Sequence, residues 1–172
     1  WWRRAVVYQV YPRSFADANG DGTGDVNGIR QRLPHLATLG IDAIWISPWY
    51  PSPLLDGGYD VADYRNISPR FGTLDDARQL IDEAHALGIR IIIDIVPNHM
   101  SFSVSTPWLR DILRHGAESR YAGHFDLDPA AGRIRLPWLT APFEEALDDG
   151  GLAVEDDPNG PVLVADGLRV PL

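Results

Sequence analysis

The sequence predicts an α/β protein with a parallel sheet, because three apolar strand-like runs alternate with two helical segments. The runs are residues 5–12 (AVVYQVYP), 41–47 (IDAIWIS) and 89–99 (IRIIIDIVPNH). The first and third carry apolar residues on both faces, which is typical of parallel strands buried under helices. The order strand, helix, strand, helix, strand implies right-handed crossovers, and both a doubly wound sheet and a (β/α) barrel satisfy it.

The two helices are predicted from the spacing of their apolar residues and from their ends. Residues 26–40 (VNGIRQRLPHLATLG) repeat leucine and isoleucine at helical intervals and stop at Gly40. Residues 73–88 (TLDDARQLIDEAHALG) begin with Thr73 as the N-cap, carry two aspartates in the first turn and stop at Gly88.

Beyond residue 100 the pattern changes, so we predict a domain boundary there, between residues 1–99 and residues 100–172. The second part predicts two short helices, a turn-linked pair of strands and irregular β structure. These lie at residues 106–116 and 141–150, within 121–139, and within 151–172.

Composition excludes several classes of function. The net charge of −9 argues against nucleic-acid binding, and no apolar run is long enough to span a bilayer. No signal peptide precedes Trp1, which favours a cytoplasmic location. The chain starts without an initiator Met and ends without a closing element, so we expect an N-terminal fragment.

Residues 17–25 (DANGDGTGD) place side-chain oxygens at alternate positions of a glycine-rich turn, a pattern that suits one hard cation. An EF-hand is excluded, because Gly28 stands where the bidentate Glu is required and the preceding AVVYQVYPRSF predicts a strand. The alternative is a solvated loop of Asx turns.

The first part of the chain resembles glycoside hydrolase family 13, the α-amylase family, and most of all its α-glucosidase and oligo-1,6-glucosidase branch. The resemblance rests on WWRRAVVYQVYPRSFADANGDGTGD, IDAIWISPWYPSPLLDGGYDVADY, FGTLDD and IIIDIVPNH, and it covers residues 1–99. It implies the first three strands and two helices of a (β/α)₈ TIM barrel. It also implies a structural Ca²⁺ or Mg²⁺, held by the side chains of Asp17, Asn19, Asp21 and Asp25 and the carbonyl of Thr23.

The same resemblance implies a sugar-binding site. Asp56 would accept hydrogen bonds from the non-reducing-end glucose, Tyr59 would stack on its ring, and His99 would bind its 6-hydroxyl. The alternatives are an exposed loop acid, a core tyrosine and a structural histidine.

Three further residues would brace this site, namely Asp60, Asp94 and Asn98. Asp94 is placed inside the third strand, where a satisfied buried carboxylate is the alternative role. Asn98 is as readily a structural residue as a ligand.

Residues 100–172 resemble a different member of the superfamily, maltooligosyl trehalose synthase, through NHMSFSVSTPWLRDILRHGAESRYAGHFDLD, GRIRLPWLTAP and the terminal VPL. Either resemblance implies that this part is domain B, the insertion between the third strand and the third helix.

The implied function is that of an α-glucosidase acting on malto- or isomalto-oligosaccharides. The catalytic carboxylates belong to later strands of the barrel, beyond residue 172, so we assign no catalytic residue and expect this chain alone to be inactive. The implied partners are an α-glucan or oligosaccharide and the C-terminal remainder of the barrel. The alternatives are a trehalose-forming transglycosylase and a catalytically silent sugar-binding module.

Overall fold

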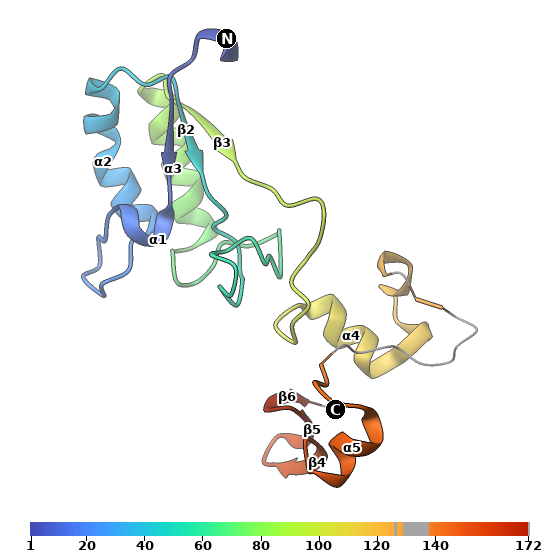
Figure 1. Ribbon diagram of the computed structural model, residues 1–172. Helices are drawn as coiled ribbons and strands as arrows, with labels where there is room; N and C mark the ends of the chain where they lie inside the picture. The colour runs from blue at the N-terminus through green and yellow to red at the C-terminus, as the bar shows by residue number, and fades with distance from the viewer. Residues whose placement is uncertain (126, 129–137, 172) are drawn as a thin grey trace. The chain divides into compact units, whose positions relative to one another are not determined.

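The computed structural model describes residues 1–125, 127–128 and 138–171. It divides the chain into two compact units, Trp1–Thr106 and Pro107–Leu172 (Figure 1). The predicted boundary, between residues 99 and 100, lies seven residues before the observed one. Each unit has a sheet of its own.

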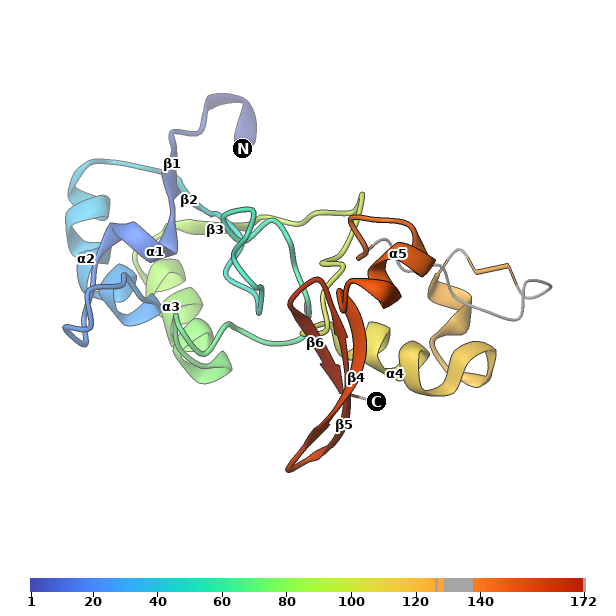
Figure 2. The ribbon, with the colours of Figure 1, turned by 60° about the horizontal axis from the view of Figure 1, so that its bottom comes forward.

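The first unit contains a parallel sheet of β1 (Val7–Val10), β2 (Ala43–Ile46) and β3 (Arg90–Ile93), in that order. The strands pair in register, with Val7 opposite Ala43 and Ala43 opposite Arg90. This confirms the predicted parallel α/β arrangement. The crossovers are α2 (Val26–Thr38) and α3 (Leu74–Ala86), which lie side by side along the strands (Figures 1 and 2).

The core of this unit lies between the two helices and one face of the sheet. Apolar residues of β1 and β2 pack there with the apolar stripes of both helices. The largest buried members include Ile44, Ile46, Leu33, Leu36 and Leu80.

Both helices begin at a side-chain cap. The Asp25 carboxylate accepts the Gly28 N–H at 2.6 Å at the start of α2. At the start of α3, the Thr73 hydroxyl accepts the Asp76 N–H while the Asp76 carboxylate accepts the Thr73 N–H. This reciprocal pair is a capping box, and it confirms Thr73 as the predicted N-cap.

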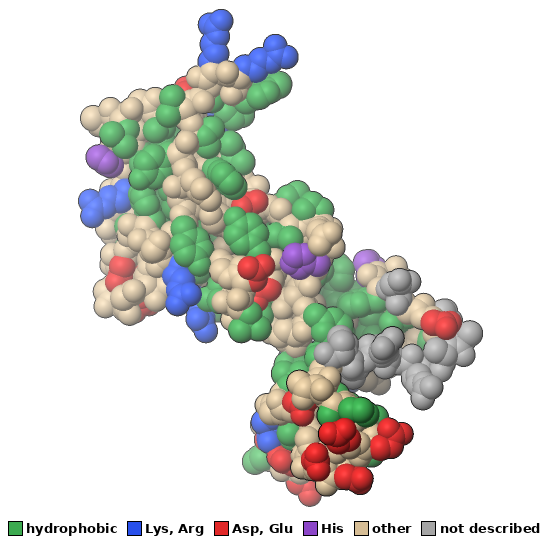
Figure 3. Space-filling view, in the orientation of Figure 1, with side chains coloured by type: hydrophobic (Ala, Val, Ile, Leu, Met, Phe, Trp, Pro, Cys, Tyr) green, Lys and Arg blue, Asp and Glu red, His purple; other side chains and the backbone are tan. Residues whose placement is uncertain are grey.

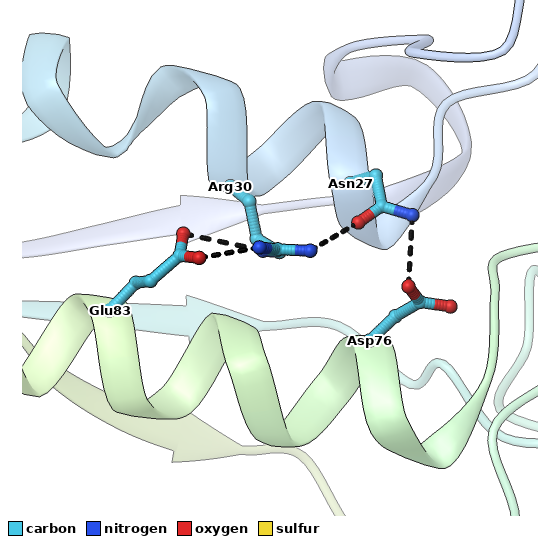
Figure 4. Close-up of polar contacts among 4 residues, drawn as sticks. All are labelled: Asn27, Arg30, Asp76 and Glu83. Atoms are coloured by element: carbon cyan, nitrogen blue, oxygen red, sulfur yellow. Dashed lines mark hydrogen bonds and ion pairs between the residues drawn. The ribbon is translucent and has the colours of Figure 1, made fainter.

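Polar side chains join α2 to α3 across their exposed sides (Figure 4). The Arg30 guanidinium donates to both carboxylate oxygens of Glu83 and to the Asn27 carbonyl oxygen. The Asn27 amide in turn donates to Asp76 at 3.0 Å. The Asn27–Asp76 hydrogen bond therefore joins the first turn of α2 to the first turn of α3.

Two expectations for the strands were wrong. The predicted first strand and its extension AVVYQVYPRSF are interrupted, because Pro12–Phe15 forms a short helix, α1. Pro12 occupies the first helical position, where its fixed φ favours a helix and its missing N–H leaves no hydrogen bond unmade. A 3₁₀ turn, η1 (Trp2–Arg4), precedes β1.

The second error concerns burial. Ala43, Ile44 and Ile46 of β2 are fully buried, whereas Val7 of β1 and Ile93 of β3 are each 43% exposed. The first and third strands are therefore not buried on both faces as predicted. The two helices cover only one face, and neither β1 nor β3 has an outer neighbour among the described strands. Figure 3 shows hydrophobic side chains exposed over these strands.

The second unit begins with helical segments and ends in a small antiparallel sheet. Its elements are α4 (Pro107–His115), η2 (Gly116–Glu118), η3 (Ala122–His124), α5 (Phe143–Asp148), β4 (Leu152–Asp157), β5 (Gly160–Ala165) and β6 (Leu168–Pro171). The strands pair in sequence order, β4-β5-β6. None of the helices in the described ranges is long and apolar enough to cross a membrane.

The two predicted short helices are confirmed as α4 and α5, and the β structure is more regular than expected. β5 and β6 are joined by the two residues Asp166 and Gly167, whose φ values of 46° and 82° suit a type I′ hairpin turn. The predicted strand pair within 121–139 lies largely outside the described residues. Its first part is the 3₁₀ turn η3 instead of a strand.

Candidate functional site

The predicted sugar-binding residues lie in two segments that follow the carboxyl ends of neighbouring strands. The first is the loop 47–73 after β2, and the second is the segment 94–106 after β3. Parallel strands place such segments at one edge of the sheet, where ligand sites of α/β proteins form. Asp94 lies just after β3, not inside it as expected, because regular strand pairing ends at Ile93.

Tyr59 and Asp94 connect these two segments directly. The Tyr59 hydroxyl donates to the Asp94 carboxylate at 3.0 Å. Burial raises the pKa of Tyr59, and the adjacent Asp94 carboxylate raises it further. The phenol therefore stays protonated at neutral pH, so it can keep donating and fix the direction of its ring.

Asp56 is exposed and begins a tight turn that leads to Tyr59. The Tyr59 N–H donates to the Asp56 carbonyl at 2.9 Å, and Gly57 and Gly58 have positive φ values of 60° and 105°. The Tyr11 hydroxyl donates to the Gly57 carbonyl at 3.1 Å. The turn is therefore held from two sides, while the Asp56 carboxylate faces solvent.

Asp60 stabilises the loop around this turn. Its carboxylate accepts hydrogen bonds from the Ser52 hydroxyl and from the Leu55 N–H. Burial raises the pKa of Asp60, but these hydrogen bonds outweigh burial and leave the pKa below its ordinary value. Asp60 is thus an ionised carboxylate whose oxygens are already engaged inside the loop.

Asn98 and His99 lie on the segment after β3, and both are exposed. The Asn98 amide nitrogen lies 3.2 Å from Nδ1 of His99. Within the described residues no hydrogen bond joins His99 to Asp56 or Tyr59. Figure 3 shows acidic side chains close to a histidine on the visible face of the first unit.

Sequence reasoning missed Tyr64, which contacts the same segment. Its hydroxyl donates to the Val96 carbonyl and accepts the Val96 N–H, each at 2.9 Å. The two residues are 32 positions apart, so no local sequence pattern predicts the contact. An aromatic residue with a polar end, in a loop that leads away from a strand end, was the one available signal.

The predicted cation loop is a series of turns in which carboxylates and an amide accept backbone N–H groups. Asp17 accepts from Asn19 and Gly20 through one oxygen and from Gly22 through the other. The hydrogen bonds from Gly22 and Gly20 hold the pKa of Asp17 below its ordinary value. Asp21 in turn accepts the Thr23 N–H at 2.7 Å.

The donor types of this loop suit a hard cation, since three carboxylates, one amide and one carbonyl supply only oxygen. Each oxygen that accepts one N–H still has a second lone pair. Asp17 is the most committed, because one of its oxygens accepts two N–H groups and the other accepts one, whereas each oxygen of Asp25 accepts one, from Gly28 or Ala18. Across the described residues no three His, Asp or Glu side chains form a ready metal cluster. The cation site therefore stays a prediction.

The chain is similar to sugar-acting enzymes along most of its length. The family model for the α-amylase catalytic domain matches residues 9–142. The chain is 61% identical over 101 residues, 59% of its length, to a probable α-glucosidase of Rhizobium meliloti and to an oligo-1,6-glucosidase of Heyndrickxia coagulans. It is 51% identical over 113 residues to a trehalose-6-phosphate hydrolase of Escherichia coli.

The chain spans about a fifth of these relatives, 18% of the first two and 20% of the third. None of these three is a maltooligosyl trehalose synthase, and the resemblance of residues 100–172 to that enzyme stays a prediction.

Solved structures support the barrel. A trehalulose synthase MutB mutant superposes on 96% of this chain and 28% of its own, with a TM-score of 0.69 and 38% identity. A MutB mutant in complex with sucrose covers 70% of this chain and 21% of its own, with a TM-score of 0.64 and 46% identity. The parallel sheet therefore matches the N-terminal part of a TIM barrel, and a small antiparallel sheet follows it. Because the catalytic-domain model matches most of its residues, the chain belongs to the α-amylase family.

Proposed function

We propose that this chain supplies the glucose-binding side of the active site of a retaining α-glucosidase that acts on malto- or isomalto-oligosaccharides. The observation that carries the proposal is the Tyr59–Asp94 hydrogen bond, which joins the segments after β2 and β3 at the sheet edge. The identity to α-glucosidases and oligo-1,6-glucosidases supports the substrate class.

Each side chain has a distinct task in this proposal. The Asp56 carboxylate accepts hydrogen bonds from two hydroxyls of the terminal glucose, and the full negative charge makes these bonds strong and directional. Tyr59 offers a flat ring to the apolar face of the sugar, with its orientation fixed by Asp94. His99 binds the 6-hydroxyl, while Asp60 and Asn98 hold the surrounding backbone and side chains.

Bond cleavage needs two further carboxyl groups, about 5–5.5 Å apart, one as the nucleophile and one as the general acid/base. The family resemblance places these groups on later strands than the three of this sheet. We therefore assign binding and orientation, but no covalent step, to the residues of this chain. The 172-residue chain is expected to bind glucose without turning over a glucoside.

We further propose that Ca²⁺ or Mg²⁺ stabilises the loop 17–25 through Asp17, Asn19, Asp21, Asp25 and the Thr23 carbonyl. A bound cation would neutralise three carboxylates and stiffen the turn that leads into α2. Adding Ca²⁺ at about 100 times its Kd would then raise the unfolding free energy by about 2.7 kcal/mol. Titration by differential scanning calorimetry tests this, and an unchanged melting temperature at millimolar Ca²⁺ would exclude the site.

Residues 100–172 would be a domain-B-like insertion, and the whole protein would act in the cytoplasm on a glucan or oligosaccharide.

Methyl α-D-glucoside binding to the 172-residue chain, measured by NMR, tests the function. Asp56→Asn should weaken binding at least tenfold, because the charged acceptor is lost. Asp82→Asn is the matched control, since Asp82 is an exposed carboxylate on α3. Equal affinities of the Asp56 variant and the unmodified chain would contradict the proposal, as would the absence of any binding.

A further inference from the structure

The backbone of Val96 is held by a side chain instead of a strand. β3 ends at Ile93, and beyond it the Tyr64 hydroxyl takes both polar groups of Val96. One hydroxyl can donate once and accept twice, so it can bond the N–H and the C=O of the same residue together. A neighbouring strand normally satisfies such groups, and Tyr64 fulfils that task here.

A second attachment lies five residues further on. The Ser101 N–H donates to the Val61 carbonyl at 2.7 Å, and the Thr106 hydroxyl donates to the Ser101 carbonyl at 2.6 Å. Val61, Ser101 and Thr106 are all buried. Residues 97–100 therefore span two fixed points, Val96 and Ser101, which are both attached to residues 61–64.

His99 depends on these attachments for its place. It is exposed, and its hydrogen-bond partner among the described residues is Asn98, which is exposed too. Neither side chain is buried, and the hydrogen bond that the structure gives them joins the two to one another. The hydrogen bonds at Val96 and Ser101 fix the backbone on either side of this pair, and so fix where the two side chains begin.

We infer that Tyr64 is a positioning residue that presents His99 to a sugar ligand; this inference rests on the proposed function. The ring of Tyr64 meets Tyr50 edge-on, with centroids 4.9 Å apart, and Tyr50 is buried. Because the ring is packed independently of the hydroxyl, Tyr64→Phe removes the two hydrogen bonds and leaves the packing in place.

The experiment compares Tyr64→Phe with the unmodified chain by NMR. The ¹⁵N relaxation of residues 97–100 and the carbon-bound proton signals of the His99 ring report on the segment, and methyl α-D-glucoside titration reports on binding. Tyr8→Phe is the matched control, because the Tyr8 ring contacts Phe15 and its hydroxyl has no hydrogen-bond partner in the described part of the chain.

Tyr64→Phe should increase the fast motion of residues 97–100, shift the His99 ring signals and weaken glucoside binding about tenfold, while Tyr8→Phe changes none of these. Unchanged relaxation and an unchanged His99 signal would overturn the inference. If the segment loosens but even the unmodified chain binds no glucoside, the attachment is supported and the proposed function fails.

A measurement on the unmodified chain covers the case in which Tyr64→Phe does not fold. Hydrogen exchange at the Val96 amide should be slowed, since its N–H is donated to Tyr64 although strand pairing has ended. Exchange at the rate of an unprotected amide would show that the attachment does not form in solution, and the inference would then be wrong.

Discussion

Gly28 lies where α2 passes close to the backbone of the preceding chain, and replacing it with alanine should destabilise the first unit. A Cβ on Gly28 would lie 2.0 Å from the Ala16 carbonyl oxygen and 2.5 Å from the Ala16 carbonyl carbon. These are backbone atoms, so no side-chain rotation relieves the overlap. The same carbonyl accepts the Asp25 N–H at 2.9 Å, and moving it would strain the residue that caps α2.

The change in unfolding free energy on Gly28→Ala is the balance of a steric cost and a gain in helix propensity. Overpacking of this kind costs about 1–3 kcal/mol, and a weakened hydrogen bond adds about 1 kcal/mol. Helix propensity acts in the other direction, because alanine is favoured over glycine inside a helix by about 1 kcal/mol. We therefore expect Gly28→Ala to lower the free energy of unfolding by about 2 kcal/mol.

Urea unfolding followed by circular dichroism measures the effect. Gly123→Ala is the control, because an added Cβ there meets no atom of the described residues within 4 Å and the backbone is not left-handed. Its effect should stay within about 0.5 kcal/mol. A Gly28→Ala chain as stable as the unmodified one, or more stable, would refute the reasoning and show that propensity outweighs the close approach.

Three more expectations follow from the helix caps and the open sheet. Thr73→Ala should lower the free energy of unfolding by about 1 kcal/mol through loss of the capping box, whereas Thr73→Ser should restore most of it in the same urea assay. Hydrogen bonds from the Thr73 side chain, then from the Thr73 N–H and Asn27, hold the pKa of Asp76 below its ordinary value. The Asp76 carboxylate therefore stabilises the folded chain fully above the ordinary carboxyl pKa, and this contribution is lost as the pH falls through the lower pKa of the folded state. Between pH 2 and 6, the urea midpoint of Asp76→Asn should therefore change less with pH than that of the unmodified chain. An equal pH dependence of the two midpoints would contradict this. Finally, the exposed apolar residues of β1, of β3 and of the segment just after β3, which includes Ile95, should make the chain self-associate. Ile95→Lys should reduce that association in sedimentation velocity, and monomer at all concentrations is the contrary result.

The parts of the fold that local chemistry decides were predictable from the sequence. Thr73 and the aspartates that follow it specify the start of α3 within four residues. Gly40 after α2 and Gly88 after α3 adopt the positive φ that ends a helix. Parallel pairing followed from the alternation of strands and helices. The short helix at Pro12 was not predictable in this way, because its neighbours have high β propensity while proline itself favours the first turn of a helix.

The remaining features depend on contacts between distant segments. The burial of Val7 and Ile93 depends on which elements cover the sheet. The sequence of an apolar strand does not show whether one face or both faces are covered. Tyr64 contacts a residue 32 positions away, and Asp94 meets Tyr59 across 35 positions. The resemblance could name Asp56, Tyr59 and His99 as a set, but not the backbone attachments that hold the segments carrying them.

The shared carboxylate of Asp76 has a consequence for how the first unit transmits changes. Asp76 bonds Thr73 at the head of α3 and Asn27 in the opening turn of α2, two residues after Asp25 closes the acidic loop. We therefore expect that tightening that loop restrains the opening turn of α3, whose Asp76 lies 49 positions after Asn27. The amides at the start of α3 should then report on the loop without any probe attached to the loop itself.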